Sequence, residues 1–311
     1  MFVFAFPPHS ELPLVESTRR LLLPHVGQML GVVSLEPDTK VMPEGEDALR
    51  NALTGKLVNV HRRGKWMWLQ MENGPCVAVH LGMTGKIVVR EATGARKGGR
   101  RLASSRIRSV QGEDETTSDG EVEWPPRFTK AVWSVGTDGT QVAFLNARRF
   151  GKLRVFTDPL APPSPIALLG PDAYTDLPDA PAFRTLLSSH GRAVKGVLLD
   201  QAVLAGIGNW IADEVLYSAG VHPARRADEL TDDEADAVHA AIEMVIRTAV
   251  DADSVSARFP PDWIFHRRWS KGSKSSPAKT AGQPSVTFVT VAGRTSAIDV
   301  KRQPKTGKRK R

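Results

Sequence analysis

Short strand patterns follow one another through the first half of the sequence with no helical pattern between most of them. In each, apolar residues alternate with polar ones or run together, and glycine turns such as Gly64, Gly82 and Asp138-Gly139 separate the segments. The expected strands are residues 57–61, 65–71, 76–81, 86–90, 131–135, 141–145 and 153–156. Strands that are not joined by helices pair antiparallel, so this half predicts a β-sandwich or barrel.

Helical periodicity flanks the strand region on both sides. A first helix is expected to begin near Leu12, with Val15, Thr18 and Leu22 facing inward and Glu16 facing outward together with Arg19 or Arg20. Further helices are expected at residues 180–189, 194–205, 210–219 and 231–252. Thr231 and Glu234 have the spacing of a capping box, which defines the start of the last helix. The fold class is therefore α+β.

Composition shifts divide the chain into segments. The proline-rich stretch 161–165 predicts a linker between a β-sandwich domain at 1–160 and a helical domain at 166–258. Aromatic, glycine and β-branched residues at 259–300 predict a small β-unit. Residues 94–123 hold six basic residues followed by six acidic ones and little to bury, so we expect a disordered insertion. The basic tail 301–311 is expected to be disordered as well.

Charge and cysteine content narrow the class of protein. The net charge is +8, which suggests a polyanionic partner, but residues 301–311 carry seven cations and no acid, so the rest carries +1. Cys76 is the single cysteine, which excludes an intramolecular disulfide and a cysteine-rich zinc site and favours an intracellular protein. The apolar runs are too short for a transmembrane helix.

Two loops hold residues suited to contact with nucleic acid. In His80-Leu81-Gly82-Met83-Thr84-Gly85, Met83 is either a wedge for a base stack or a core residue. The loop Asn146-Ala147-Arg148-Arg149-Phe150-Gly151 places two cations directly before an aromatic residue. The alternative for this second loop is a solvated pair of charges with Phe150 in the core.

A third candidate is the stretch from Val203 to Glu214. A helical pattern stops at Gly206, and a new one starts at Asn209, a residue type that caps helices well. The amide groups at such a helix start could receive a phosphate, with a further donor from the Asn209 side chain. A tight helix-turn-helix without a ligand is the alternative.

Six motifs in this order resemble the formamidopyrimidine-DNA glycosylase family. They are SELPLVE at residues 10–16, HRRGKW at 61–66, HLGMTG at 80–85, NARRFG at 146–151, LLDQ through GIGNWIADEVLYSAGVHP at 198–223, and FVTVAGRT at 288–295. The long fifth motif is similar to the family's helix-two-turn-helix element. Because the last region lacks cysteines, the resemblance is closest to the plant and fungal branch, whose finger hairpin holds no zinc.

The resemblance implies a DNA repair enzyme that excises oxidised purines, such as 8-oxoguanine and formamidopyrimidines, and then cleaves the backbone by β/δ-elimination. It implies that Met83, Arg148 and Phe150 fill the space left by the extruded base. It implies phosphate contacts by Lys65, His80, Asn209 and Arg294. We expect no metal or other cofactor, double-stranded damaged DNA as partner, a monomer, and no membrane association. The basic tail favours the nucleus as location.

The start of the first motif departs from the family. The family's nucleophile is an N-terminal proline amine followed by a catalytic glutamate; here Glu11 matches the glutamate, while Ser10 stands in place of the proline with nine residues before it. An amide nitrogen at Ser10 forms no Schiff base, and Leu14 replaces a second family glutamate. Either the true start differs and the enzyme is intact, or the protein is a lyase-deficient DNA-binding relative with Lys65 as a remote substitute amine. The downstream motifs favour the enzyme, and the β-rich first half argues against a helix-turn-helix transcription factor.

Overall fold

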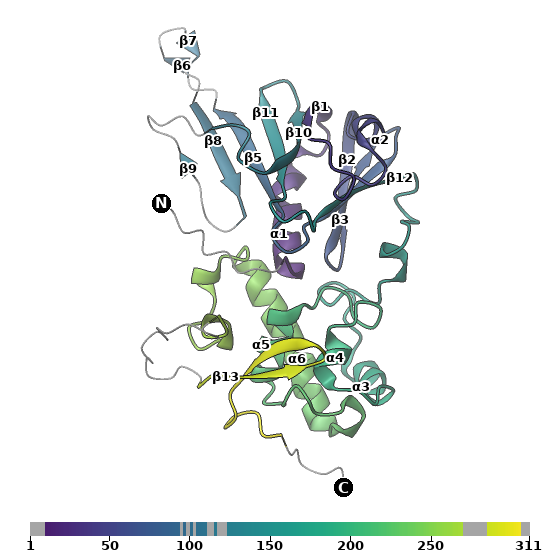
Figure 1. Ribbon diagram of the computed structural model, residues 1–311, viewed down its shortest axis with the longest axis vertical. Helices are drawn as coiled ribbons and strands as arrows, with labels where there is room; N and C mark the ends of the chain where they lie inside the picture. The colour runs from purple at the N-terminus through teal and green to yellow at the C-terminus, as the bar shows by residue number, and fades with distance from the viewer. Residues whose placement is uncertain are drawn as a thin grey trace. The chain divides into compact units, whose positions relative to one another are not determined.

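The computed structural model describes residues 10–269 and 285–305, except residues 94–95, 98–99, 102–103, 111–114 and 117–122. The chain divides into two compact units (Figure 1). Unit 1 runs to Ala167 and includes Asp253–Val255; unit 2 contains Leu168–Ala252 and the chain from Ser256 onward. The predicted domain bounds are finer than this division and stay a prediction.

Unit 1 is built on an antiparallel sheet that confirms the α+β class. Its ten strands lie in the order β12-β4-β3-β2-β1-β10-β11-β5-β8-β9. The strands are β1 (Met29–Leu35), β2 (Gly55–Arg63), β3 (Trp66–Met71), β4 (Cys76–His80), β5 (Lys86–Thr93), β8 (Ser104–Ser109), β9 (Glu115–Thr116), β10 (Thr129–Val135), β11 (Thr140–Leu145) and β12 (Lys152–Phe156). Two short strands, β6 (Arg96–Lys97) and β7 (Arg100–Arg101), pair separately.

All seven predicted strands are present, but sequence patterning missed β1. The register of β1 against β10 shifts between Val32 and Ser34, and Val33 is half exposed. The shift interrupts the alternation of apolar and polar residues that would have marked the strand. The short helix α2 (Glu46–Ala52), which buries Leu49 and Ala52, was missed as well.

Part of the expected disordered insertion is ordered, so that expectation is wrong for residues 104–109. Strand β8 pairs with β5 along its whole length, from Ser104 opposite Thr93 to Ser109 opposite Val88. The strand buries the apolar residue Ile107. Pairing with an existing edge satisfies the backbone groups of β8, which charge content alone does not reveal. The remaining gaps in 94–122 lie outside the described residues.

Helix α1 (Leu12–Leu22) begins where predicted and packs on β2 and β3. Val15 and Leu22 join the core of unit 1, whose largest members include Trp133 and Phe144. Thr18 is buried too, and its hydroxyl donates to the Leu14 carbonyl at 2.7 Å. The turn 23–25 (η1) follows directly.

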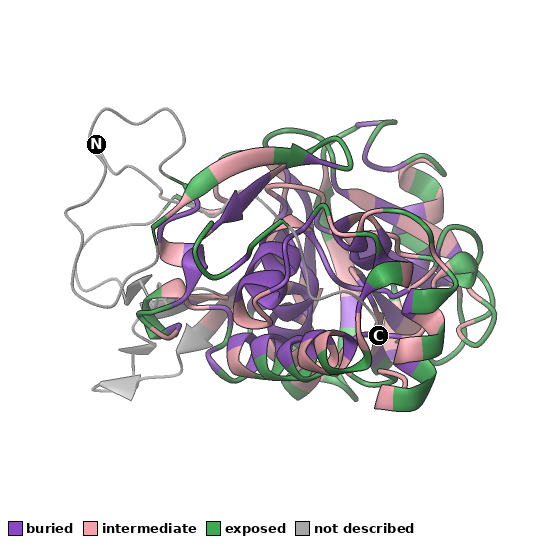
Figure 2. Cartoon of the chain, turned by 90° about the horizontal axis from the view of Figure 1, so that it is seen from below, coloured by how far each residue is buried: buried purple, intermediate pink, exposed green. Residues whose placement is uncertain are grey.

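Unit 2 contains the predicted helices. They are α3 (Ala180–Ser188), α4 (Val194–Leu198), α5 (Asn209–Ser218) and α6 (Asp232–Asp251), with 3-10 turns at Ala227–Glu229, Ser256–Arg258 and Ile264–His266 (η3 to η5). The turn Ile166–Leu168 (η2) lies where the chain passes from unit 1 to unit 2. Both capping-box bonds between Thr231 and Glu234 are formed. Figure 2 shows helices on which buried and exposed segments alternate. Helix α6 buries the predicted face that includes Val238, Ile242 and Val245, whereas α5 is buried from Trp210 to Tyr217.

Helix α4 is shorter than the predicted 194–205. It ends at Leu198, where side chains begin to replace the helical backbone bonds. Asp200 accepts the amide of Ala202 at 3.0 Å, and the Gln201 side chain bonds both the amide of Gly206 and the carbonyl of Ile207. The expected helix therefore gives way to a turn well before Gly206.

A β-hairpin completes unit 2, and the chain beyond it is anchored. Strands β13 (Thr287–Val291) and β14 (Arg294–Ile298) are joined by Ala292 and Gly293 at positive φ, and the hairpin lies beside α5 (Figure 1). Arg302 donates to the carbonyls of Tyr217 and Ser218, and the buried Gln303 donates to Val221. The expectation of a disordered tail is wrong for residues 301–305; residues 306–311 lie outside the described part.

Candidate nucleic-acid interface

The predicted catalytic positions open helix α1. Ser10 and Glu11 are both buried, and Glu11 occupies the N-cap position with extended backbone. Its carbonyl accepts the first helical bond, from the amide of Val15. Residue 10 is thus fixed by the helix that follows it, as a nucleophile at this position requires.

Glu16 connects this helix to the turn that carries Lys65. Its carboxylate accepts from Arg19 and Arg20 on α1 and from Arg62 on β2, at 2.8–3.1 Å. Arg62 in turn donates to the carbonyl of Gly64, next to the half-buried Lys65. The prediction that Glu16 faces outward is wrong, because the helix turns this residue toward β2, where Arg62 neutralises it.

The charges around Glu16 also set its protonation. Burial raises the pKa of Glu16, but hydrogen bonds and charges from Arg19 and Arg62 outweigh burial and lower it below 4.5. The carboxylate is therefore ionised at neutral pH. The buried anion thus joins α1 to the strand β2 and, through Arg62, to the turn at Gly64.

The two predicted DNA-binding loops meet because β4 pairs with β12. Lys152 lies opposite His80 in the ladder, so the loops that adjoin these residues run against each other. A Cβ atom at Gly82 would lie 2.5 Å from the backbone nitrogen of Gly151. Gly82 also has a positive φ of 65°, so glycine is needed there for both contact and conformation.

Side chains of the two loops touch at their tips. The Arg148 guanidinium lies 3.3 Å from the sulfur of Met83, and its Cζ lies 5.3 Å from the ring centre of Phe150. Phe150 is 53% exposed, so the alternative that places it in the core is wrong. A half-buried thioether, an exposed cation and an exposed aromatic ring thus form one group, here called the wedge cluster (Met83, Arg148, Phe150).

Arg149 points to a different partner from Arg148. It forms a two-pronged ion pair with Asp38, at 2.6 and 2.8 Å, and Lys130 lies 3.4 Å from the same carboxylate. The hydrogen bond from Arg149, opposed by burial and assisted by Lys130, lowers the pKa of Asp38 to about 2. Arg149 has a φ of 57°, so this pair fixes a turn that leaves Arg148 and Phe150 exposed. No local pattern marks Asp38, which is 111 residues away.

His80 is held as a neutral hydrogen-bond donor. Burial, with the charges of Lys65 and Lys152, lowers its pKa to about 4. The amide of Gly82 donates to Nδ1 at 3.1 Å, so the one proton of the neutral ring is on Nε2. Trp66 packs beside the ring, with centres 4.8 Å apart. The ring is thus set to donate to an acceptor such as a phosphate oxygen.

We expect the imidazole of His80 to stay neutral from pH 8 down to pH 5. A lowered histidine pKa means that its contribution to stability is present above the ordinary pKa of 6.5 and is lost as the pH falls toward 4. Two-bond ¹H–¹⁵N NMR spectra should show protonation at Nε2 alone throughout this range. Titration of His80 near pH 6.5, or a proton on Nδ1, would contradict the geometry.

Asn209 and Arg294 lie close together within unit 2. Asn209 is the first residue of α5, with Gly208 rather than Asn209 as the N-cap, which corrects the predicted cap. Its Nδ2 donates to the carbonyl of Thr295 at 3.1 Å, next to the exposed Arg294 that opens β14. Asn209 and Arg294, the two predicted phosphate-binding residues of unit 2, are far apart in the sequence. The hydrogen bond from Asn209 to Thr295, the residue after Arg294, brings them together.

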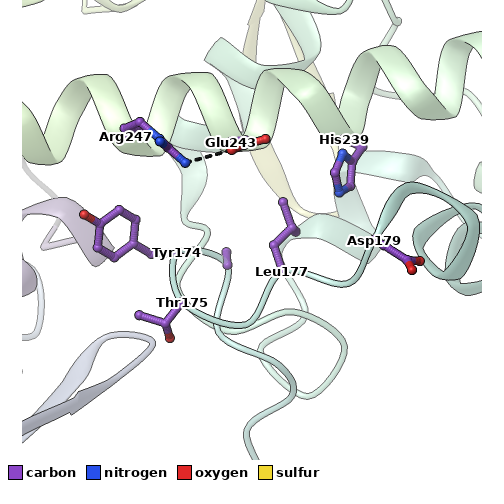
Figure 3. A pocket seen from close by; sticks show the side chains of 8 residues that line it. Tyr174, Thr175, Leu177, Asp179, His239, Glu243 and Arg247 are labelled. Carbon is purple, nitrogen blue, oxygen red and sulfur yellow. Dashed lines mark hydrogen bonds and ion pairs between the residues drawn. The ribbon is translucent and has the colours of Figure 1, made fainter.

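Unit 2 also has a surface pocket of about 270 Å³ between residues 173–179 and α6 (Figure 3). Its charged groups are already partnered: Glu243 with Arg247 at 2.7 Å, His239 with the Pro178 carbonyl, and Asp179 with the amide of Ala182. None of the predicted site residues lines it, and we assign it no ligand.

The described residues form neither a metal site nor a membrane-spanning helix. Among them, no group of three or more histidine, cysteine, aspartate or glutamate side chains is arranged to hold a metal ion. None of their helices is long and apolar enough to cross a bilayer. Independence from zinc stays a prediction.

Comparison with known proteins agrees with this architecture. Residues 10–153 match the family profile described as the formamidopyrimidine-DNA glycosylase N-terminal domain, and residues 169–260 match its H2TH domain. A formamidopyrimidine-DNA glycosylase from Arabidopsis thaliana is 33% identical over 92% of this chain and 69% of its own length. The Bacillus subtilis protein of that name is 29% identical over 95% of this chain and 99% of its length.

Solved structures are similar over nearly the whole chain. The MutM (Fpg) protein of Thermus thermophilus is 28% identical with a TM-score of 0.66, covering 96% of this chain and all of that one. A Lactococcus lactis formamidopyrimidine-DNA glycosylase, solved non-covalently bound to DNA containing an AP site, shares the fold at 24% identity, with a TM-score of 0.70 over 95% of this chain and all of that one. By class the chain is a helix-two-turn-helix protein. It belongs to the formamidopyrimidine-DNA glycosylase family, and the Arabidopsis relative agrees with the predicted plant-like branch.

Proposed function

We propose that this protein excises oxidised purines from double-stranded DNA and cleaves the backbone at the resulting abasic site, in base excision repair. The observation that carries the proposal is the wedge cluster. Met83 and Arg148 come from loops 65 residues apart, and their contact gives an exposed apolar and cationic tip. An enzyme that acts on a base inside a duplex must extrude that base and fill the space it leaves.

The start of α1 supplies the proposed chemistry. In a chain that starts at residue 10, the α-amine of that residue attacks C1′ of the damaged nucleotide, a C–N bond forms, and the base leaves with the electron pair of its glycosidic bond and takes up a proton. Glu11 is placed one residue away to transfer protons during these steps. The C1′–O4′ bond of the sugar then breaks, O4′ takes up a proton, and a Schiff base forms at C1′. The Schiff base acidifies the C2′ hydrogen, and removal of that hydrogen as a proton breaks the C3′–O bond and expels the 3′ phosphate.

Phosphate contacts hold the duplex in this proposal. Lys65 and Arg294 offer positive charge, while His80 and Asn209 offer neutral N–H donors. Only the two cations release counterions from the backbone, so they contribute to the salt dependence of binding and the other two do not. Replacing Lys65 or Arg294 should therefore reduce the salt dependence of binding, whereas replacing His80 or Asn209 should not.

A lyase-deficient damaged-DNA-binding protein is the second candidate. It is favoured by Ser10, which has a peptide-bonded nitrogen when residues 1–9 precede it. The two candidates share the wedge cluster and the phosphate contacts. They differ only in whether a base is released.

A binding and base-release assay tests the proposed function. We expect the full chain to bind an 8-oxoguanine duplex at least about tenfold more tightly than an undamaged one, with the preference lost in Met83→Ala. Free 8-oxoguanine, measured by chromatography for the full chain and for a chain that starts at residue 10, decides between the candidates: release by either chain that is lost in Glu11→Gln supports the enzyme, and binding without release by both supports the second candidate. Equal affinity for both duplexes would contradict both.

We further propose that the protein acts as a monomer in the nucleus. The support is the basic sequence Lys308-Arg309-Lys310-Arg311, which fits an import signal. Light scattering during gel filtration tests the monomer. A fluorescent fusion with and without residues 306–311 tests the location. An unchanged distribution in the cell would show that the basic sequence is not an import signal.

A further inference from the structure

A buried ionic cluster joins the helices of unit 2 to the hairpin. The Nζ of Lys195 on α4 lies 2.6 Å from Asp213 on α5 and donates to the hydroxyl of Ser296 on β14 at 2.8 Å. The other oxygen of Asp213 accepts from Arg268 at 2.9 Å. We call these four residues the hairpin network (Lys195, Asp213, Arg268, Ser296). All are buried, and Lys195 and Ser296 are 0% exposed.

Hydrogen bonds of the hairpin network and of Asn209 are made at three consecutive residues of β14. The carbonyl of Thr295 accepts from both Lys195 and Asn209, at 3.2 and 3.1 Å. The hydroxyl of Ser296 accepts from Lys195, and the amide of Ala297 donates to Asp213 at 3.1 Å. The strand is therefore fixed by directional bonds immediately after Arg294.

Apolar packing alone fixes this hairpin less well. It has two strands, and such a hairpin is marginally stable by itself. In one small apolar cluster Ala297 packs with Tyr217 and Ile264, alongside the partly buried Val286 and Phe288, and Val291 and Ile298 of the hairpin are also buried. A slip of one residue would turn Arg294 to the other face of the strand, move the buried side chains off the apolar cluster and break every bond of the network.

A buried ion pair adds little net stability to a fold, but it forms only when its groups are held in one geometry. Two charges removed from water pay a desolvation cost that their attraction roughly balances. The pair persists only where its hydrogen bonds are all made, which here requires β14 in one register. Glu214, the next residue on α5, holds the turn Ile264–His266 in a similar way by accepting the amides of Ile264 and Phe265.

We propose that Lys195 and Asp213 are positioning residues that hold Arg294 and Asn209 in place for the DNA backbone. They touch no substrate and act through Thr295, Ser296 and Ala297. The inference rests on the proposed function, because it assumes that Arg294 binds a phosphate. The phosphate contact of Arg294 on β14 then depends on the buried Lys195 on α4.

A double-mutant cycle on the full chain tests this proposal. The variants are Lys195→Met, Arg294→Ala and both together, and Kd for an 8-oxoguanine duplex is measured against salt. We expect each single variant to weaken binding about tenfold and to reduce the slope of log Kd against log salt by about 0.9, the value for one phosphate contact. The double variant should match the single ones, because Arg294 is already misplaced without Lys195.

Two further variants separate positioning from general effects. Lys56→Met removes an exposed lysine of unit 1, paired with Glu72, and should leave both Kd and slope unchanged. Ser296→Ala removes one acceptor of Lys195, and we expect a smaller loss that also disappears in the Arg294→Ala background. This mild variant carries the test if Lys195→Met does not fold, as judged by circular dichroism.

The results separate a failure of the positioning role of Lys195 from a failure of the DNA contact by Arg294. Independent effects, about a hundredfold loss in the double variant, or wild-type binding by a folded Lys195→Met would overturn the positioning role. If Arg294→Ala itself leaves affinity and slope unchanged, or the wild-type chain does not prefer the oxidised duplex, the DNA contact assumed by the proposed function fails instead.

Discussion

A chain that starts at residue 10 and carries Ser10→Pro will be trapped on DNA containing 8-oxoguanine when borohydride is present. The change supplies a free secondary amine at the buried start of α1, beside Glu11. An α-amino group has a pKa of about 7.7–8.0, which leaves a neutral, nucleophilic fraction near pH 7. Attack at C1′ gives a Schiff base, and hydride reduction of its C=N bond makes the link permanent.

The matched controls locate the nucleophile. The full chain has an amide nitrogen at residue 10, so its adduct should form at least about 100-fold more slowly. Glu11→Gln in the truncated chain should lose about 10²–10⁴-fold, the range for general acid–base catalysis. Gel electrophoresis under denaturing conditions measures the adduct. Efficient trapping of the full chain would place the amine elsewhere, and loss of that adduct in Lys65→Arg would identify Lys65.

Glu16→Ala will destabilise unit 1 by about 3–5 kcal/mol, the cost of leaving a buried charge without its partner. The Arg62 side chain is 3% exposed and would lose its carboxylate, while its bond to Gly64 would lose its support. Urea unfolding measures the change. Glu72→Ala, which breaks an exposed pair with Lys56, should cost no more than about 1 kcal/mol.

The effect of Glu16→Ala should depend on pH in a defined direction. Because the pKa of Glu16 is lowered in the fold, its contribution is present at neutral pH and is lost as the pH falls below 4.5 through the lowered pKa. The difference between Glu16→Ala and the wild type should therefore shrink in acid. A difference that grows in acid, or a cost equal to that of Glu72→Ala, would show that Glu16 is not the anion that holds Arg62.

The residues proposed to contact DNA could be identified in the sequence because they occur in short contiguous motifs. HLGMTG and NARRFG each combine glycines with the residues that those glycines expose, so a resemblance in sequence carries the loop geometry with it. The residues that hold these loops and the hairpin were not predictable. Asp38, Lys195 and Asp213 lie on separate elements, and neither spacing nor periodicity connects them to their partners.

The sequence by itself determined the features that depend on neighbours along the chain. The start of α1, the seven strands and the capping box of Thr231 and Glu234 follow from local periodicity and local hydrogen bonds. Only the tertiary structure decided which charges are buried. Glu16 looked like a solvated residue and is an interior anion, and the basic segment 301–305 is anchored through Arg302 and Gln303. The physical reason is that a charge is stable in the interior only beside an opposite charge or a hydrogen-bonding group, and folding brings that partner from a distant part of the chain.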